Sequence, residues 1–108
     1  MKTKLIGVDA MRRGTTPTHV FNVDADFTSA EAIYITYRQN QKNILEKTIE
    51  DITVTEKKIE TQLTQQETLM FQKGEVEIQI RVKMPDGSAY ASQIMKVPVE
   101  MILKEGVI

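Results

Sequence analysis

The only histidine of the chain, His19, is the one side chain whose ordinary pKa lies close to neutrality, so it is the first candidate for acid–base chemistry. A histidine that activates a nucleophile also needs a serine or cysteine and an orienting carboxylate within reach. No serine motif surrounds His19, and the chain has no cysteine. His19 alternates with Phe21 and Val23, which is typical of a strand. We therefore interpret His19 as a structural or surface residue and predict no catalytic residue and no enzyme.

Three aspartates near the start of the chain, Asp9, Asp24 and Asp26, could in principle bind a hard cation through their oxygens. Their spacing differs from that of a calcium loop, which places oxygen ligands at regular intervals around a fixed glycine. Short aspartate side chains also bond to nearby backbone amides in turns. We predict that these residues form turns, and that the chain has no metal ligands and no cofactor.

A compact basic and hydroxyl-rich segment could hold a phosphate or an acidic partner surface. It consists of Arg12, Arg13 and Gly14 followed by Thr15 and Thr16. The segment lacks the lysine and glycine spacing of a phosphate-binding loop. We favour the alternative that the arginines are solvated or pack against their own domain, so we predict no cofactor-binding residue here.

The tyrosines Tyr34, Tyr37 and Tyr90 could stack against a nucleic-acid base or a sugar. A nucleic-acid partner would also require a basic surface, whereas 14 lysines and arginines are balanced by 15 acidic residues, for a net charge of -1. We therefore expect no nucleic-acid partner and interpret the tyrosines as core and sheet-packing residues.

Length and composition indicate a single globular domain. The chain has 108 residues, of which 41% are hydrophobic and 27% charged. The absence of cysteine excludes disulfides and zinc–thiolate sites and suits a reducing compartment. Residues 1–11 are too polar for a signal peptide, and no run of about 18 apolar residues occurs, so we expect no membrane span and no membrane partner.

The clearest element is Glu75 to Met84, where apolar and polar residues alternate with a period of two. This pattern predicts a strand with one buried and one solvated face. Pro85-Asp86-Gly87 then predicts a turn, and Ala89 to Val99 the returning strand. A bulge near Gln93 would bring the apolar residues of the return onto one face. Pro98 cannot donate a ladder hydrogen bond and indicates a sheet edge.

Shorter segments predict the remaining strands. They are His19 to Val23, Ile33 to Tyr37, Ile44 to Thr48 after a turn at Gln39 to Asn43, Ile52 to Val54, and Lys58 to Leu63.

The spacing of Thr64 and Glu67 matches a capping box and predicts a helical turn over Gln65 to Met70, although Glu56 to Phe71 could also be one helix. We favour the strand followed by the helical turn. The predicted fold class is all-β, an immunoglobulin-like antiparallel β-sandwich with about seven short strands and one short helical turn.

The run from Met11 to His19, Met-Arg-Arg-Gly-Thr-Thr-Pro-Thr-His, resembles the opening of small β-sandwich proteins encoded in phage and prophage structural (tail or baseplate) gene blocks of Gram-positive bacteria. The resemblance continues through Leu63–Leu69, Val76–Val82 and from Asp86-Gly87 to the last strand, so it covers nearly the whole chain after Ala10. It implies a non-enzymatic protein of the virion tail or baseplate, located in the host cytoplasm during assembly and then in the virion.

Such proteins usually begin near Met11. We therefore expect residues 1–14 to be a flexible N-terminal extension and residues 15–108 to form the single sandwich domain. The expected partners are other phage structural proteins or a second copy in a homo-oligomer, bound through the edge near Pro98 or through the apolar residues Met101, Ile102, Leu103, Val107 and Ile108. The alternative for these apolar residues is that they fold back on the sandwich and complete its own core. The alternative is a carbohydrate- or cell-surface-binding module, which an exposed Tyr34 or Tyr90 beside a groove would favour.

Overall fold

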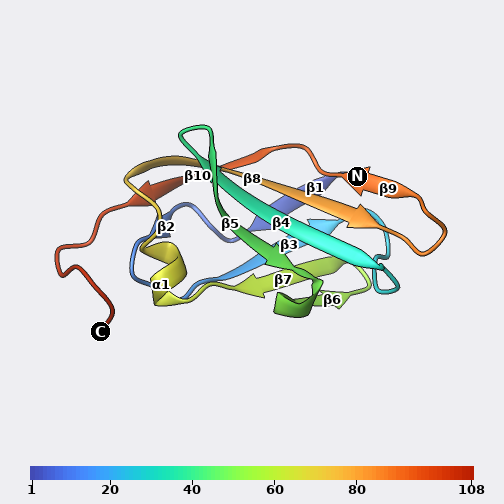
Figure 1. Cartoon of the computed structure of the whole chain (residues 1–108), viewed down its shortest axis with the longest axis horizontal. Coiled ribbons are helices and arrows are strands. Elements are labelled where there is room, and N and C mark those ends of the chain that lie inside the picture. Colours follow the sequence, from blue (N-terminus) through green and yellow to red (C-terminus); the bar gives the residue numbers. More distant parts are fainter.

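Strands whose apolar residues all fall on one face can bury them only against a second such face. The computed structural model, which describes residues 1–108, shows two sheets packed in this way (Figure 1). The elements are β1 (Thr3–Ile6), β2 (Met11–Arg12), β3 (Thr18–Val23), β4 (Ala32–Gln39), β5 (Lys42–Thr48), the 3₁₀ turn η1 (Ile49–Asp51), β6 (Ile52–Thr55), β7 (Lys58–Gln62), α1 (Gln65–Thr68), β8 (Gly74–Lys83), β9 (Ala89–Ala91) and β10 (Met95–Glu100).

One sheet has the strand order β1-β3-β7-β6, and the other has the order β2-β10-β8-β4-β5, with β9 added beside β8. All neighbours are antiparallel except β2 and β10, which run parallel where Met11 lies opposite Val99. The chain therefore enters the first sheet through β1 and crosses to the second through β2. No helix is long and apolar enough to cross a membrane.

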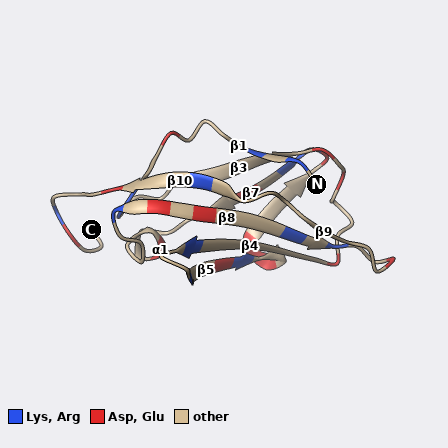
Figure 2. Cartoon of the chain, turned by 90° about the horizontal axis from the view of Figure 1, so that it is seen from above, with Lys and Arg blue, Asp and Glu red and all other residues tan.

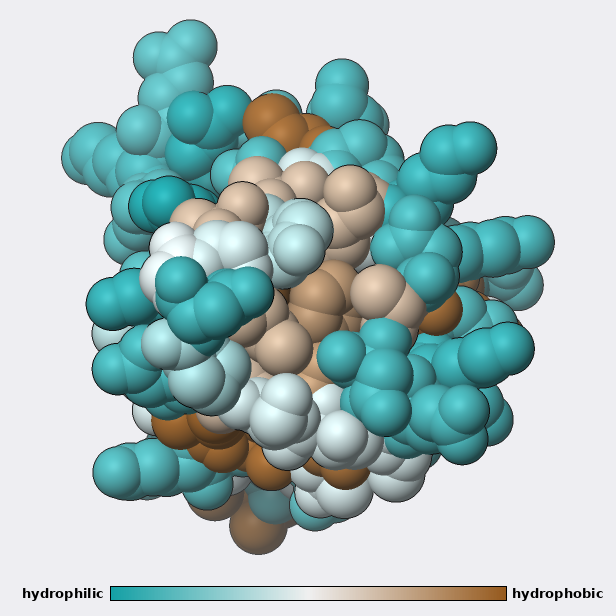
Figure 3. Space-filling view, turned by 90° about the vertical axis from the view of Figure 1, so that its right-hand side faces the viewer, coloured by the Kyte–Doolittle hydropathy of each residue, from teal (hydrophilic) through white to brown (hydrophobic).

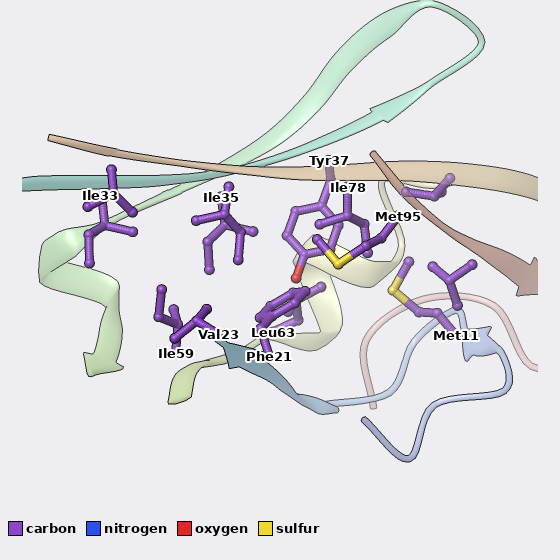
Figure 4. Packing of buried hydrophobic residues seen from close by; sticks show 14 of the residues in the cluster. Met11, Phe21, Val23, Ile33, Ile35, Tyr37, Ile59, Leu63, Ile78 and Met95 are labelled. Carbon is purple, nitrogen blue, oxygen red and sulfur yellow. The ribbon is translucent and has the colours of Figure 1, made fainter. Parts of the chain in front are cut away.

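The core lies between the two sheets, and most of its members come from the inward faces of β3, β4, β8 and β10 (Figure 4). On β8 the residues Val76, Ile78, Ile80 and Val82 are all buried, as the alternation predicts. The face predicted to be solvated is only partly so: Arg81 is exposed, whereas Glu77 and Gln79 are half-buried. The largest fully buried core residues outside β8 are Met11, Phe21, Ile33, Ile35, Tyr37 and Ile59 from other strands, and Leu63 and Phe71 from the segments on either side of α1.

The hairpin after β8 contains the expected irregularity. The turn holds Gly87 at φ +91°, and Asp86 accepts hydrogen bonds from the backbone and hydroxyl of Ser88. Arg81 lies opposite Ala91, but Ile78 lies opposite Met95, so the returning strand contains one extra residue between these pairs. Residues 92–94 therefore interrupt the return, which consists of β9 and β10.

The corner before β8 forms as the capping-box spacing predicts. The hydroxyl of Thr64 accepts a hydrogen bond from the backbone N–H of Glu67 at 3.1 Å, and Glu67 Oε1 accepts one from the Thr64 backbone at 2.8 Å. Glu67 Oε1 also lies 2.7 Å from Nζ of Lys47 on β5. The corner, which follows β7 of one sheet, is thereby attached to β5 of the other sheet. The alternative of one continuous helix from Glu56 to Phe71 is excluded, because β7 and α1 are separate elements.

Three expectations need correction. Residues 1–14 are part of the sandwich, because β1 pairs along its whole length with β3, and β2 pairs with β10. The strands number ten, since β1 and β2 join the sheets and the return is split into β9 and β10. The end of β10 is not a free edge, because β2 covers Val99 and Glu100, directly after Pro98.

We expect Ile80→Ala to lower the free energy of unfolding by about 2–5 kcal/mol, because it removes a fully buried side chain and leaves a cavity. Gln79→Ala on the outer face is the matched control and should cost no more than about 1 kcal/mol, since it removes one hydrogen bond to the Ser92 carbonyl. Urea unfolding of both variants measures the difference, and equal losses would contradict the face assignment.

We expect Thr64→Ala to lower the free energy of unfolding by roughly 0.5–2 kcal/mol through loss of the N-cap. Thr64→Ser retains the hydroxyl and should recover most of this loss. Gln66→Ala changes the neighbouring exposed side chain and should be nearly neutral. Thermal unfolding of the three variants tests the assignment, and a Gln66 effect as large as that of Thr64 would argue against it.

Candidate functional site

The basic segment that sequence reasoning singled out lies at the end of the molecule where the chain terminates. Arg13 is largely buried, with 14% of its side chain exposed, and its guanidinium faces three groups. Nε donates to the Phe71 carbonyl at 2.7 Å, and a second nitrogen donates to the Leu69 carbonyl at 3.2 Å. A third binds the Glu105 carboxylate at 2.5 and 2.8 Å. Because its donors are used within the chain, Arg13 packs against its own domain, as we favoured.

Arg12 makes a second set of contacts with the same end of the chain. It donates to the Met101 carbonyl at 2.6 Å and pairs with the Glu100 carboxylate at 3.1 Å. The turn that follows contains Gly14 at φ +74°, and a β-carbon there would lie 2.8 Å from Cδ1 of Ile102. The segment therefore holds the residues that follow β10 rather than a free anion.

These residues, 101–108, form what we call the C-terminal arm, which leaves β10 and passes beside α1 (Figure 1). Gln65 holds the far end, since its Oε1 accepts from the Ile108 backbone N–H at 2.9 Å and its Nε2 donates to the Ile108 carbonyl at 3.3 Å. The side chains of the arm nevertheless face solvent: Leu103 is fully exposed, and Met101, Val107 and Ile108 are also exposed. The arm is thus an apolar surface held in place by polar contacts.

The outer face of the sheet that contains β8 forms a second surface. Along β8 the charges change from Glu75 and Glu77 to Arg81 and Lys83, as Figure 2 shows. Glu77 pairs with Arg38 of β4 at 2.9 Å. Beyond this pair lies a groove of about 410 Å³ lined by Tyr34, Arg81 and Lys83 together with Glu31, Ala32, Val82 and Ala89.

Of the three tyrosines, only Tyr37 is a core residue. Tyr34 lies in the groove on β4 with 44% of its surface exposed, and Tyr90 is exposed at the end of the molecule opposite the arm. The assignment of all three to packing was therefore wrong for two of them. Alternation along β4 could have shown that Tyr34 faces away from Ile33 and Ile35, since it has the opposite parity.

Of the three aspartates, Asp26 forms a local turn as expected, Asp24 bonds to the distant N-terminal backbone, and Asp9 lies in a bend between β1 and β2. Asp26 accepts hydrogen bonds from the hydroxyl and the backbone N–H of Thr28, and these bonds hold the pKa of its carboxyl below the ordinary value. Asp24 accepts a hydrogen bond from the Lys2 backbone at 3.0 Å. Both line the end of the molecule that carries Tyr90.

His19 is a core residue and is shielded from solvent. Its Nδ1 and the hydroxyl of Tyr37, which comes from the facing sheet, are joined by a hydrogen bond of 2.7 Å. Its Nε2 is buried without a partner. Burial lowers the pKa of His19 to about 4, so the ring is neutral at pH 7. A neutral, enclosed imidazole bonded to a core tyrosine links the two sheets.

We expect His19 to make the protein acid-sensitive between pH 6.5 and pH 4. The unfolded chain binds a proton at pH 6.5 and below, whereas the folded chain does not until about pH 4, so stability falls as the pH falls through this window, by up to about 3 kcal/mol. His19→Gln retains an acceptor for Tyr37 and removes the titration. Urea unfolding at several pH values should show that the free energy of unfolding of this variant falls less between pH 6.5 and pH 4 than that of the wild type. The same pH dependence in both proteins would contradict the assignment.

Comparison with known proteins identifies the fold. No family model matches the chain, and no curated protein matches it. Among solved structures, the fibronectin(III)-like modules of Clostridium thermocellum CbhA are similar to it, with a TM-score of 0.52 and 14% sequence identity over 94% of this chain and 99% of that chain. This likeness shows the fold alone: the chain is an all-β, immunoglobulin-like sandwich.

Proposed function

We propose that this chain is a non-enzymatic structural module of a phage or prophage tail or baseplate, and that it binds other proteins through the C-terminal arm. The observation that carries the proposal is the arm itself. Its side chains Met101, Leu103, Val107 and Ile108 are exposed, although such a concentration of apolar groups is normally covered.

The contacts beneath the arm support a binding role. Ion pairs and hydrogen bonds from Arg12, Arg13 and Gln65 hold the backbone of the arm against the domain. A preformed binding segment loses less conformational entropy on association than a free tail does. The arm is therefore arranged so that its exposed side chains are available to a partner.

The phage assignment is supported by the resemblance of Met11–His19, Leu63–Leu69 and Val76–Val82 to small tail and baseplate proteins. The fold agrees with what that resemblance implies, a β-sandwich. On this proposal the chain folds in the host cytoplasm and becomes part of the virion, and its surfaces rather than a pocket perform its function.

We expect purified virions from the source strain to contain the protein in a fixed ratio to the tail proteins, as measured by quantitative mass spectrometry. Leu103→Ser with Val107→Ser should fold normally, because both side chains are exposed, and should be largely lost from the particles. Gln66→Ser, also exposed, is the matched control and should be incorporated normally. Absence of the wild-type protein from particles would contradict the proposal.

A second candidate, a carbohydrate- or cell-surface-binding module, is favoured by one observation. Tyr34 is exposed in the groove beside Arg81 and Lys83, so an aromatic ring lies next to groups that can bind hydroxyls. On this proposal a sugar ring would stack on Tyr34.

We expect titration with cell-wall oligosaccharides to detect binding if this second candidate is correct, and Tyr34→Ala to weaken that binding by at least about tenfold, the equivalent of one lost aromatic contact. Tyr90→Ala is the control, because Tyr90 is equally exposed but lies outside the groove. Binding that both variants retain would place the sugar elsewhere, and no binding by the wild type would exclude the candidate for these ligands.

A further inference from the structure

The end of the molecule opposite the arm carries an apolar hollow. It has a volume of about 270 Å³ and is lined by Met1, Phe27, Met84 and Tyr90, together with Ala25 and the aspartates Asp24 and Asp26. Figure 3 looks onto this end and shows apolar atoms at its centre, with hydrophilic side chains around them. An apolar centre with a polar rim is the usual composition of a protein-binding surface.

The hollow has an aromatic wall that is only partly covered. The rings of Phe27 and Tyr90 lie 5.7 Å apart with 56° between their planes, and Phe27 is buried whereas Tyr90 is exposed. A half-exposed tyrosine packed against a buried aromatic residue offers a large apolar contact without further ordering of the side chain. The hollow is therefore a preformed site for an apolar side chain.

The arm cannot fill the hollow of its own chain. The molecule is 47 Å long, and the arm and the hollow lie at opposite ends of it (Figure 1). The bonds from Arg13 to Glu105 and from Gln65 to Ile108 hold the arm at its own end. The arm can therefore reach only the hollow of another copy.

We propose that the hollow receives the C-terminal arm of a second copy of this chain, so that the copies join head to tail. This inference rests on the proposed function, because it names the partner of the same arm. Of the two charged side chains of the arm, Glu105 is paired with Arg13, which leaves Lys104 as the available charge. The carboxylates of Asp24 and Asp26 line the hollow and are complementary to Lys104.

A contact of this kind joins different surfaces of the two copies, so each added copy leaves one free arm and one free hollow. The result is an open linear oligomer rather than a closed dimer. An eight-residue arm buries less surface than a standard protein interface, so association should be weak in dilute solution and stronger where copies are concentrated.

Sedimentation velocity on the full chain, from about 10 μM to about 1 mM, should show a mass that rises continuously with concentration. Leu103→Ser, which changes a fully exposed side chain, should weaken association by at least about tenfold. Tyr90→Glu places a carboxylate in the hollow and should have a similar effect. Gln66→Ser, which is exposed and belongs to neither the arm nor the lining of the hollow, should associate as the wild type does, and circular dichroism checks that every variant is folded.

Mixing the two defective proteins provides the decisive experiment. Tyr90→Glu retains an intact arm, and Leu103→Ser retains an intact hollow. At a concentration where the wild type associates only in part, each variant alone should be largely monomeric, and the mixture should form a 1:1 dimer and nothing larger. A wild type that is monomeric throughout, a Tyr90→Glu variant that assembles normally, or a mixture that stays monomeric would each overturn the inference.

The two proposals fail separately. If the arm variant is lost from virions while Tyr90→Glu is incorporated normally, the arm binds another tail protein, and the self-association is wrong although the proposed function stands. If the mixture dimerises but the protein is absent from virions, the self-association is supported, and the proposed function in the phage tail or baseplate is wrong.

Discussion

The structure depends on the burial of one face of β4 and β8 against one face of β3 and β7. Ile35 and Ile80 lie opposite each other in neighbouring strands, and both are fully buried. Since side chains alternate along a strand, a shift of one residue in either strand would expose its whole apolar set. The register of the central strands and the placement of Tyr34 on the outer face both follow from this constraint.

The two sheets are also joined by polar groups that the core must accommodate. The hydrogen bond between Tyr37 and His19 crosses the core, and burial of the hydroxyl raises the pKa of Tyr37 while burial of the imidazole lowers that of His19. Both groups are thereby kept neutral. At the corner, burial tends to raise the pKa of Glu67, but bonds from Lys47 and Thr64 outweigh it, so the carboxylate stays charged and bonded. Each sheet is thus connected to the other by neutral or paired groups.

The functional surfaces arise from how the ends of the sandwich are constructed. Arg13 binds the carbonyls at the end of α1 and the carboxylate of Glu105, so a single side chain connects the corner to the C-terminal arm. At the other end, the loop after β3 and the hairpin after β8 meet, and Phe27 and Tyr90 come together there. The sandwich thus carries exposed apolar side chains at one end and an apolar hollow at the other. The proposals for its function follow from that arrangement.

The sequence by itself determined the elements whose signals are local. Alternation over Glu75 to Met84, the turn at Asp86-Gly87 and the capping box at Thr64 and Glu67 each depend on residues a few positions apart, and each was found in the structure. Only the tertiary structure decided what distant segments do. β1 and β2 are too short to show a period, and they are strands because β3 and β10 offer them backbone partners, in the case of β2 some 88 residues away. The sequence also did not show which groups bond to Arg13, what holds the arm in place or that Tyr90 packs against Phe27, because a side chain's partner across the fold leaves no pattern in its own neighbourhood.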